Sequence, residues 1–281
     1  MPRPLLVATD LDGTLLRNDG TLSARTLDAL RTTSGAGAEV VLVTARPPRY
    51  LDALAAATGL TGTAVCSNGA IVYNIAGRTV TGSTPLAASV ARRVAAALRD
   101  AAPGVGFAVE TGHHLRWAPG YGHHLPEDAD AELPVRSLAE LWTAPGPVVK
   151  LLAWSPALDA DALLAVAEHA AGGGAQFTHS GGRGLLEVSA RGVTKAAALA
   201  ALCADRGIPA ERVVAFGDMP NDLPVLTWAG TACAVANAHP AVLAAVPHRT
   251  ASNEDDGVAR VLERLFGIPG TPAKESSRPH M

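Results

Sequence analysis

Two short acidic motifs contain the residues of this chain that are best suited to chemistry. They are Asp10-Leu11-Asp12-Gly13-Thr14 and Gly217-Asp218-Met219-Pro220-Asn221-Asp222. Of two carboxylates spaced two residues apart, one can attack phosphorus while the other transfers protons. If the two motifs meet in the fold, four carboxylates share one site, which requires a cation because like charges repel. Neither motif contains His or Cys, so oxygen ligands favour Mg²⁺ over zinc.

Each motif also has a simpler interpretation. The first could be a turn with two solvated aspartates, or a calcium-binding loop. An EF-hand loop needs a glutamate at its twelfth position, where this chain has Thr21. The second motif could be an acidic turn that caps the following helix, which would explain Asp222 better than the whole hexapeptide.

Both motifs directly follow short apolar runs that we expect to be buried parallel strands. Four such runs cover residues 5–8, 40–43, 63–66 and 213–216. Helical patterns at 23–33, 50–57 and 194–205 alternate with them, and Ser23 is a plausible N-cap. This alternation predicts an α/β fold with a doubly wound parallel sheet, which binds ligands at the carboxyl ends of its strands. Asp10, Thr44, Ser67-Asn68 and Asp218 all follow predicted strands.

The middle of the chain, residues 82–187, has a different pattern. It combines helical patterns at 86–98 and 158–171 with apparent strands at 105–110, 114–117 and 148–154 and two more flanking 180–184. We expect an α+β cap domain inserted into a catalytic core of residues 1–81 and 188–268. The core should end with a helix at 223–228, a last strand at 232–235 and a helix at 258–265. The proline-containing tail, 269–281, is expected to be disordered.

The amino-acid composition argues against several classes of function. The chain has 281 residues, 48% of them hydrophobic, which is enough for two domains. The net charge of -3 and the absence of a basic stripe argue against nucleic-acid binding. No apolar run approaches the roughly 18 residues of a membrane span. Three scattered cysteines and the lack of a signal-peptide pattern indicate the cytoplasm.

Taken together, the motifs resemble those of the haloacid dehalogenase (HAD) superfamily in order and spacing. The residues that carry this resemblance are Asp10–Thr14, Thr44, Lys195 and Gly217-Asp218-x-x-Asn221-Asp222. Three further segments, 66–70, 192–195 and 252–259, resemble the Cof-type branch. The similarity covers nearly all of residues 5–266. It implies a Rossmann-like core with an α/β cap of the C2 type, and a phosphatase that uses Mg²⁺.

The resemblance also assigns roles to the acidic residues. It makes Asp10 the nucleophile that forms an aspartyl phosphate. Asp12 becomes the general acid and then the base, with its backbone carbonyl on the metal. Asp218 would bind the metal together with Asp10 and Asp12. Asp222 would orient Lys195.

Phosphate binding is assigned by the resemblance to Thr44, Lys195 and Asn221, with Asn68 in support. Arg46 could contact the substrate or brace its turn, and bracing is favoured. Ala45 stands where the family usually has glycine, and its methyl group should fit if the residue is helical.

The expected substrate is a small phosphorylated metabolite, such as a sugar phosphate, nucleotide or cofactor phosphate. A sugar phosphomutase-like enzyme and a non-catalytic phosphosugar-binding regulator are alternatives. The regulator is disfavoured because binding alone does not require Asp12. The pairs His113-His114 and His123-His124 suggest a metal site, but adjacent histidines in a strand point to opposite faces. We expect surface histidines, with a substrate contact for one of them as the alternative.

Overall fold

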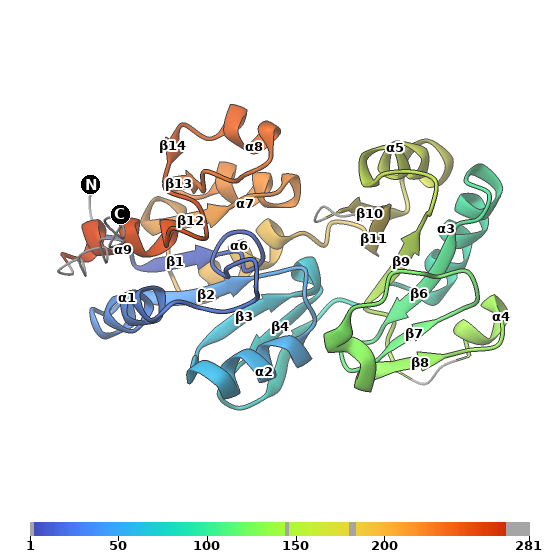
Figure 1. The fold of residues 1–281 in the computed structure, drawn as a ribbon, viewed down its shortest axis with the longest axis horizontal. Helices are drawn as coiled ribbons and strands as arrows, with labels where there is room; N and C mark the ends of the chain where they lie inside the picture. The colour runs from blue at the N-terminus through green and yellow to red at the C-terminus, as the bar shows by residue number, and fades with distance from the viewer. Residues whose placement is uncertain (1–2, 144–145, 180–183, 268–281) are drawn as a thin grey trace, which may run out of the picture.

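The protein folds into two lobes, each built on a β-sheet (Figure 1). The computed structural model describes residues 3–143, 146–179 and 184–267. The larger lobe contains an eight-stranded sheet with the order β14-β13-β12-β1-β2-β3-β4-β5. Its strands are β1 (Leu6–Thr9), β2 (Glu39–Val43), β3 (Thr63–Cys66), β4 (Ile71–Asn74), β5 (Thr79–Ser83), β12 (Val213–Gly217), β13 (Thr231–Ala234) and β14 (His248–Arg249).

Strand β1 lies at the centre of this sheet, and its four residues are buried. It pairs in parallel with β12 on one side and β2 on the other, with Thr9 opposite Phe216 and Leu42. Parallel strands end at the same edge of a sheet, so the residues that follow β1, β2 and β12 come together there. Only β4 and β5 are antiparallel to their neighbours among the described strands of this sheet.

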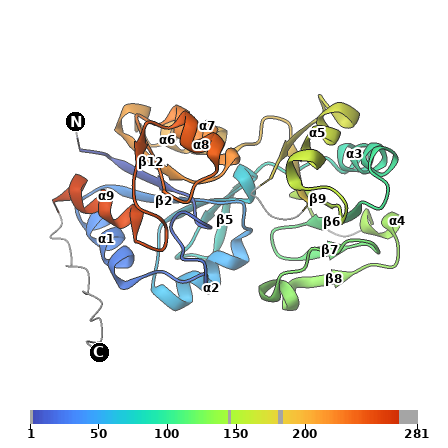
Figure 2. The same cartoon turned by 45° about the horizontal axis from the view of Figure 1, so that its top comes forward.

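Helices cover both faces of the larger sheet (Figure 2). On one face lie α1 (Ala24–Gly35), α2 (Pro48–Thr58) and α9 (Gly257–Phe266), and on the other α6 (Lys195–Asp205), α7 (Leu223–Trp228) and α8 (Pro240–Ala245). Ser23 caps α1 by accepting a hydrogen bond from the Thr26 N–H at 2.9 Å. The Arg25 guanidinium joins α1 to α9 through two hydrogen bonds to Glu263, at 2.7 and 2.6 Å.

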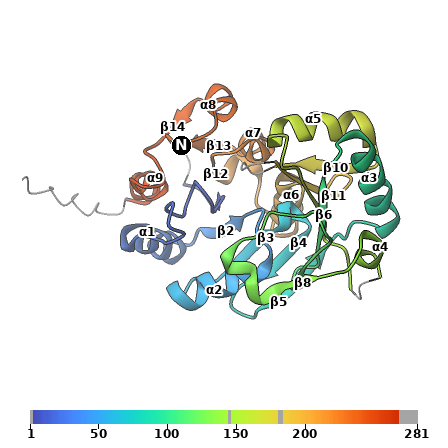
Figure 3. The ribbon, with the colours of Figure 1, turned by 45° about the vertical axis from the view of Figure 1, so that its right-hand side comes forward.

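The smaller lobe contains a six-stranded sheet with the order β10-β11-β9-β6-β7-β8. Its pairs are antiparallel except for β7 with β8. The strands are β6 (Gly106–Glu110), β7 (Leu115–Trp117), β8 (Glu132–Pro134), β9 (Lys150–Trp154), β10 (Ala175–Thr178) and β11 (Leu185–Ala190). Helices α3 (Ala88–Ala101) and α5 (Ala160–Ala171) lie side by side on its outer face, near the short α4 (Leu138–Leu141) (Figure 3).

The α/β fold and its parallel sheet are confirmed. The prediction that the strand at 232–235 is the last one is wrong, because β14 follows it and pairs with β13. The sequence pattern also missed the β4–β5 hairpin, β8, α4 and α8. Strand β5 reaches Ser83 and β11 reaches Ala190, so both sheets extend past the expected junctions at 82 and 187. The tail at 269–281 lies outside the described residues.

A helix that spans a membrane needs roughly 18 or more predominantly apolar residues. In the part of the chain that the structure describes, no helix is both long enough and apolar enough to cross a bilayer.

Candidate active site

A buried lysine between two aspartates forms the centre of the site. Lys195, the first residue of α6, places its Nζ 2.6 Å from Asp10 Oδ1 and 2.7 Å from Asp222 Oδ1. The helix begins here because the Thr194 side chain accepts a hydrogen bond from the Ala197 N–H. Burial alone would lower the pKa of Lys195, but the attraction of both carboxylates outweighs it and keeps this pKa above its usual value. Lys195 is therefore a fixed positive charge.

Three carboxylates surround this point. Asp10, Asp218 and Asp222 are all buried, and each offers an oxygen within 4.8 Å of the others. Burial raises the pKa of Asp10 well above its usual value, and Asp222 and Asp218 raise it further while Lys195 opposes them. Burial, with repulsion from Asp222, raises the pKa of Asp218 to about 6. A lysine alone does not balance this charge, so the oxygen-only cluster fits a divalent cation.

The turn after β1 holds Asp218 in place. The Thr14 hydroxyl donates a hydrogen bond to Asp218 Oδ1 at 2.7 Å. Gly13 has a φ of +72°, and a Cβ at this position would lie 2.5 Å from Asp218 Oδ2. Glycine is required here for both reasons, because other residues disfavour this conformation and the carboxylate needs the space. Residues of the first motif thus fix a carboxylate of the second.

Asp222 is held by backbone groups as well as by Lys195. Its Oδ2 accepts hydrogen bonds from the N–H groups of Asp218 and Met219, both at 3.0 Å. With Oδ1 on Lys195, both oxygens of Asp222 have partners that are part of the protein. Asp222 is therefore placed to position Lys195 and the turn, whereas Asp10 and Asp218 retain more capacity to bind a metal.

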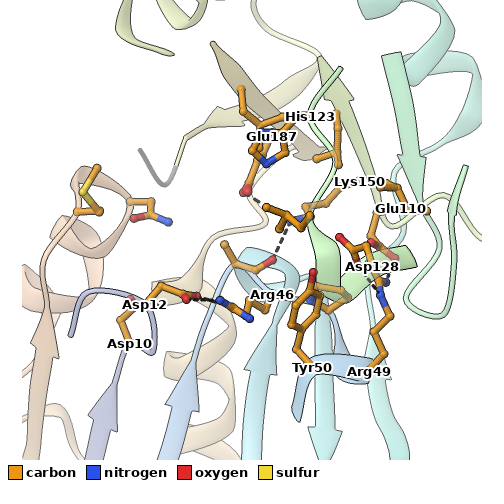
Figure 4. Close-up of a pocket in the computed structure, with 18 of the residues that line it drawn as sticks. Asp10, Asp12, Arg46, Arg49, Tyr50, Glu110, His123, Asp128, Lys150 and Glu187 are labelled. Atoms are coloured by element: carbon orange, nitrogen blue, oxygen red, sulfur yellow. Dashed lines mark hydrogen bonds and ion pairs between the residues drawn. The ribbon is translucent and has the colours of Figure 1, made fainter. Parts of the chain in front are cut away.

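The Asp12 carboxylate lies outside the close group formed by Asp10, Asp218 and Asp222, although it lines the same pocket as Asp10. Its side chain is 49% exposed and forms two hydrogen bonds with Arg46, from Nε at 2.7 Å and from Nη2 at 2.5 Å (Figure 4). The Arg46 guanidinium also lies over the ring of Tyr50, 4.6 Å from its centroid. Arg46 thus braces Asp12, the residue expected to transfer protons.

The phosphate-binding candidates lie around the same strand ends. Thr44 is fully buried, and its hydroxyl accepts a hydrogen bond from the Arg46 N–H at 3.1 Å. The Asn221 amide donates to Asn68 Oδ1 at 3.3 Å, while Asn221 Oδ1 is buried without a hydrogen-bond partner among the described residues. Ala45 is not among the described non-glycine residues with positive φ, so its methyl group fits without backbone strain.

A pocket of about 280 Å³ connects these residues to the smaller lobe (Figure 4). Charged side chains cross the boundary between the lobes around it. Arg49 of α2 donates to Glu110 at 2.9 Å and to Asp128 at 2.6 Å. Lys150 of β9 donates to the backbone carbonyl of Ala45 at 2.8 Å. These contacts hold the smaller lobe over the strand ends.

The charged pocket residues of the smaller lobe were missed by the sequence analysis. Glu110, Lys150 and Glu187 are each less than 5% exposed, and each lies in a strand that is otherwise mostly apolar. Charged residues are rarely buried unless they have partners. A single charge inside an apolar strand was therefore an available signal for these positions. Asn68 also binds this group, since its amide donates to the Glu187 carboxylate.

The histidines do not form a metal cluster in the described residues. His113 and His114 are exposed, as expected. His124 Nδ1 lies 2.9 Å from Glu132 Oε1, and the imidazole ring contacts the rings of Trp117 and Tyr121. His123 is half-buried and lines the pocket, and burial lowers its pKa. Of the four, His123 is the histidine placed to contact a substrate.

Comparison with known proteins gives a consistent result. Residues 7–262 match the family described as haloacid dehalogenase-like hydrolase. The chain is 30% identical to the 5-amino-6-(5-phospho-D-ribitylamino)uracil phosphatase YitU of Bacillus subtilis, over 95% of this chain and 99% of that protein. It is 28% identical to the pyridoxal phosphate phosphatase YbhA of Escherichia coli, over 92% and 97%.

A solved structure extends this similarity to three dimensions. A haloacid dehalogenase-like hydrolase from B. subtilis superposes with a TM-score of 0.81 and 25% identity, over 93% of this chain and 99% of that one. The motifs, the strand-end cluster and these similarities agree over almost the whole length. This chain belongs to the haloacid dehalogenase-like hydrolase family.

Proposed function

We propose that this enzyme is a Mg²⁺-dependent phosphatase that hydrolyses small phosphomonoesters through a phosphorylated Asp10. The observation that carries the proposal is the Asp10 carboxylate at the end of β1. Asp10 is buried and pairs with Lys195 at 2.6 Å, and it lines the pocket between the lobes. A carboxylate oxygen fixed in this way is suited to attack phosphorus, because phosphoryl transfer depends mainly on positioning and on neutralising oxygen charge.

In the first step, an oxygen of Asp10 forms a bond to phosphorus while the bond from phosphorus to the leaving oxygen breaks. Asp12 gives its proton to that oxygen, so the product leaves as an alcohol. In the second step, water attacks the aspartyl phosphate, Asp12 takes a proton from it, and inorganic phosphate leaves. Because Arg46 holds both Asp12 oxygens, at least one must move away from the guanidinium before Asp12 can act.

Three other side chains would bind the phosphoryl group. Lys195 would offset the charge between Asp10 and the phosphate. The Thr44 hydroxyl accepts from the Arg46 N–H, so its own proton can be donated to a phosphoryl oxygen. The Asn221 amide, which lines the same pocket as Asp10 and Lys195, would add a further donor. Asn68 supports Asn221 through their hydrogen bond.

Asp10, Asp218 and the backbone carbonyl of Asp12 would hold the Mg²⁺ ion, which when bound neutralises charge on the phosphoryl oxygens. The raised pKa values of Asp10 and Asp218 support this assignment, because burial first and repulsion from neighbouring carboxylates second disfavour their charged forms, and a bound cation would relieve both effects. Two further elements belong to the proposal. The smaller lobe would be the cap domain expected for residues 82–187, and the buried free cysteines suit a reducing cytoplasm.

The relatives support a small metabolite as substrate. YitU and YbhA are named for the phosphates of a ribitylaminouracil and of pyridoxal, both of them small phosphorylated organic molecules. The pocket, about 280 Å³ in volume, leaves room for a leaving group of modest size.

Hydrolysis of p-nitrophenyl phosphate by purified wild type and Asp10→Asn tests the proposal. Wild type should release phosphate with Mg²⁺, lose this activity in excess chelator and recover it on Mg²⁺ addition. Asp10→Asn should keep its fold, checked by circular dichroism, and retain less than about 1% of the activity. A folded Asp10→Asn protein with more activity would refute the nucleophile. Phosphate-ester binding without turnover in wild type would instead favour the non-catalytic regulator.

A further inference from the structure

The loop after β13 contacts both acidic motifs. It covers residues 235–239 and lies between β13 and α8. The Asn237 side-chain amide donates a hydrogen bond to the Gly13 carbonyl at 2.7 Å. Two residues later, the His239 N–H donates to the Asp218 carbonyl at 2.8 Å. One loop thus holds the backbone of both turns that contribute carboxylates to the site.

The contact with Gly13 fixes a point where the backbone could otherwise turn. Glycine has no side chain to restrict φ and ψ, so a hydrogen bond to its carbonyl limits a rotation that another residue would itself oppose. The peptide group before Gly13 carries the Asp12 carbonyl, which is proposed to bind the metal. The peptide group after it leads to Thr14, whose hydroxyl donates to Asp218 Oδ1 at 2.7 Å. Holding the Gly13 carbonyl therefore orients two groups of the proposed metal site.

A second asparagine fixes the first. The Asn253 N–H donates to Asn237 Oδ1 at 3.0 Å, so both ends of the Asn237 amide have partners. Because the oxygen must accept and the nitrogen must donate, only one orientation of this amide satisfies both contacts. Asn253 is 4% exposed, and its Nδ2 donates to the Leu16 carbonyl at 2.9 Å and to Asn18 Oδ1 at 3.0 Å. The segment at 252–259 is thereby joined to the residues that follow the first motif.

Asn237 influences the site through other residues. It is not among the described residues that line the pocket, and its amide oxygen already accepts from Asn253. A residue that bound the metal or the substrate directly would need a free polar group that faces the pocket. The contacts of Asn237 instead lead to Gly13 and, through Thr14, to Asp218.

We propose that Asn237, fixed by Asn253, is a positioning residue that raises the affinity of the site for Mg²⁺. The inference rests on the proposed function, because it concerns the metal site of that reaction. Groups that orient metal ligands without touching the metal typically change metal affinity by roughly 10- to 100-fold. Asn237 acts on the backbone next to the ligands, so we expect an effect at the lower end of this range.

Asn237→Ala tests this role by direct binding of Mg²⁺ to the full-length protein without substrate, measured by isothermal titration calorimetry. The Kd for Mg²⁺ should rise about tenfold relative to wild type. The Mg²⁺ concentration that gives half-maximal hydrolysis of p-nitrophenyl phosphate should rise by a similar factor. The kcat at saturating Mg²⁺ should fall less than the affinity does, because excess metal still fills the site.

Asn74→Ala is the matched control. Asn74 Oδ1 accepts a hydrogen bond from the Gly77 N–H at 2.7 Å, in the turn between β4 and β5. Asn74 and Asn237 are both exposed, and each substitution removes one hydrogen bond between a side chain and the backbone. Both variants should therefore show a similar, small decrease in the metal-free melting temperature. Only Asn237→Ala should bind Mg²⁺ more weakly.

A double-mutant cycle tests the route from Asn237 to Asp218. Thr14→Val removes the hydroxyl that holds Asp218 and changes the shape of the side chain little. If Asn237 acts through the peptide group between Gly13 and Thr14, Asn237→Ala should raise the Kd for Mg²⁺ by less than about threefold in the Thr14→Val background. A full tenfold effect in that background would overturn this route.

The results separate the positioning role from the function on which it rests. An unchanged Mg²⁺ affinity in Asn237→Ala, or equal weakening in Asn237→Ala and Asn74→Ala, would overturn the role of Asn237. Hydrolysis by wild type that depends on Mg²⁺ and Asp10 would still stand in that case. Wild type that binds no Mg²⁺ and hydrolyses no phosphate ester would refute the proposed function, and the positioning role would fail with it.

Discussion

Replacement of Asp218 by asparagine should stabilise the metal-free protein while it removes activity. Asp218 is 7% exposed, and its pKa is raised from 3.8 to about 6, first by burial and then by repulsion from Asp222. An acid with a raised pKa in the folded state favours folding while protonated and loses this contribution as pH rises through the folded pKa. The loss corresponds to about two pKa units, or roughly 3 kcal/mol. The asparagine side chain of the variant can still accept the hydrogen bond from Thr14, so little else changes.

Urea unfolding in excess chelator, from pH 4 to pH 8, measures this effect. Asp218→Asn and wild type should be about equally stable near pH 4, where the carboxyl is protonated. The variant should gain up to roughly 3 kcal/mol by pH 7 to 8. Mg²⁺ should then stabilise wild type and have little effect on the variant, because a ligand that binds only the folded state adds to its stability. Asp28→Asn is the control, since that side chain is 75% exposed and should change stability by less than about 0.5 kcal/mol.

A change in unfolding free energy of the opposite sign would refute this reasoning. If Asp218→Asn were less stable than wild type at pH 7.5 without metal, the cluster would not carry uncompensated charge. The argument for a cation at this site would then lose its physical basis.

Three other substitutions have expected outcomes that follow from the same contacts. Asp12→Asn should slow hydrolysis of an alkyl phosphate about a hundredfold more than that of an aryl phosphate, because only the poor leaving group needs a proton; steady-state kinetics on both would show it. Arg49→Met removes the cation that bridges the buried Glu110 and Asp128, so urea unfolding should show a loss of about 3 kcal/mol in stability. Lys195→Met should abolish turnover and lower metal-free stability by a similar amount, and Mg²⁺ should recover part of that stability in thermal melts.

The parallel sheet could be predicted from sequence because its strands are continuous apolar runs that end in polar residues. Buried parallel strands require this composition, and helical patterns between them fix the topology. The β4–β5 hairpin could not be predicted in the same way. Most of β5 is exposed, so Thr79–Ser83 shows no apolar pattern, and the hairpin forms because β4 pairs with the edge of β3. The two-residue β14 could not be predicted either, because both of its residues are exposed.

Part of the candidate site followed from sequence for an electrostatic reason, and part did not. Aspartates at the ends of neighbouring parallel strands could be expected to gather, and Asp10 and Asp218 do so. Lys195 was assigned by the resemblance to the family, and it pairs with Asp10. The position of Asp12 depends on Arg46, whose side chain comes from another strand end, and motif spacing does not determine such a pairing. Glu110 and Asp128 have a partner in Arg49 only because the two lobes meet, which is a tertiary effect.

The central claim is that Asp10 carries the phosphoryl group during turnover. Wild type mixed briefly with substrate and Mg²⁺ can be quenched in acid, digested and examined by mass spectrometry. The account predicts one phosphorylated peptide, with the phosphate on Asp10, that appears before phosphate release and is absent in Asp10→Asn. Rapid turnover without any phosphorylated peptide, or with the phosphate on another residue, would contradict it.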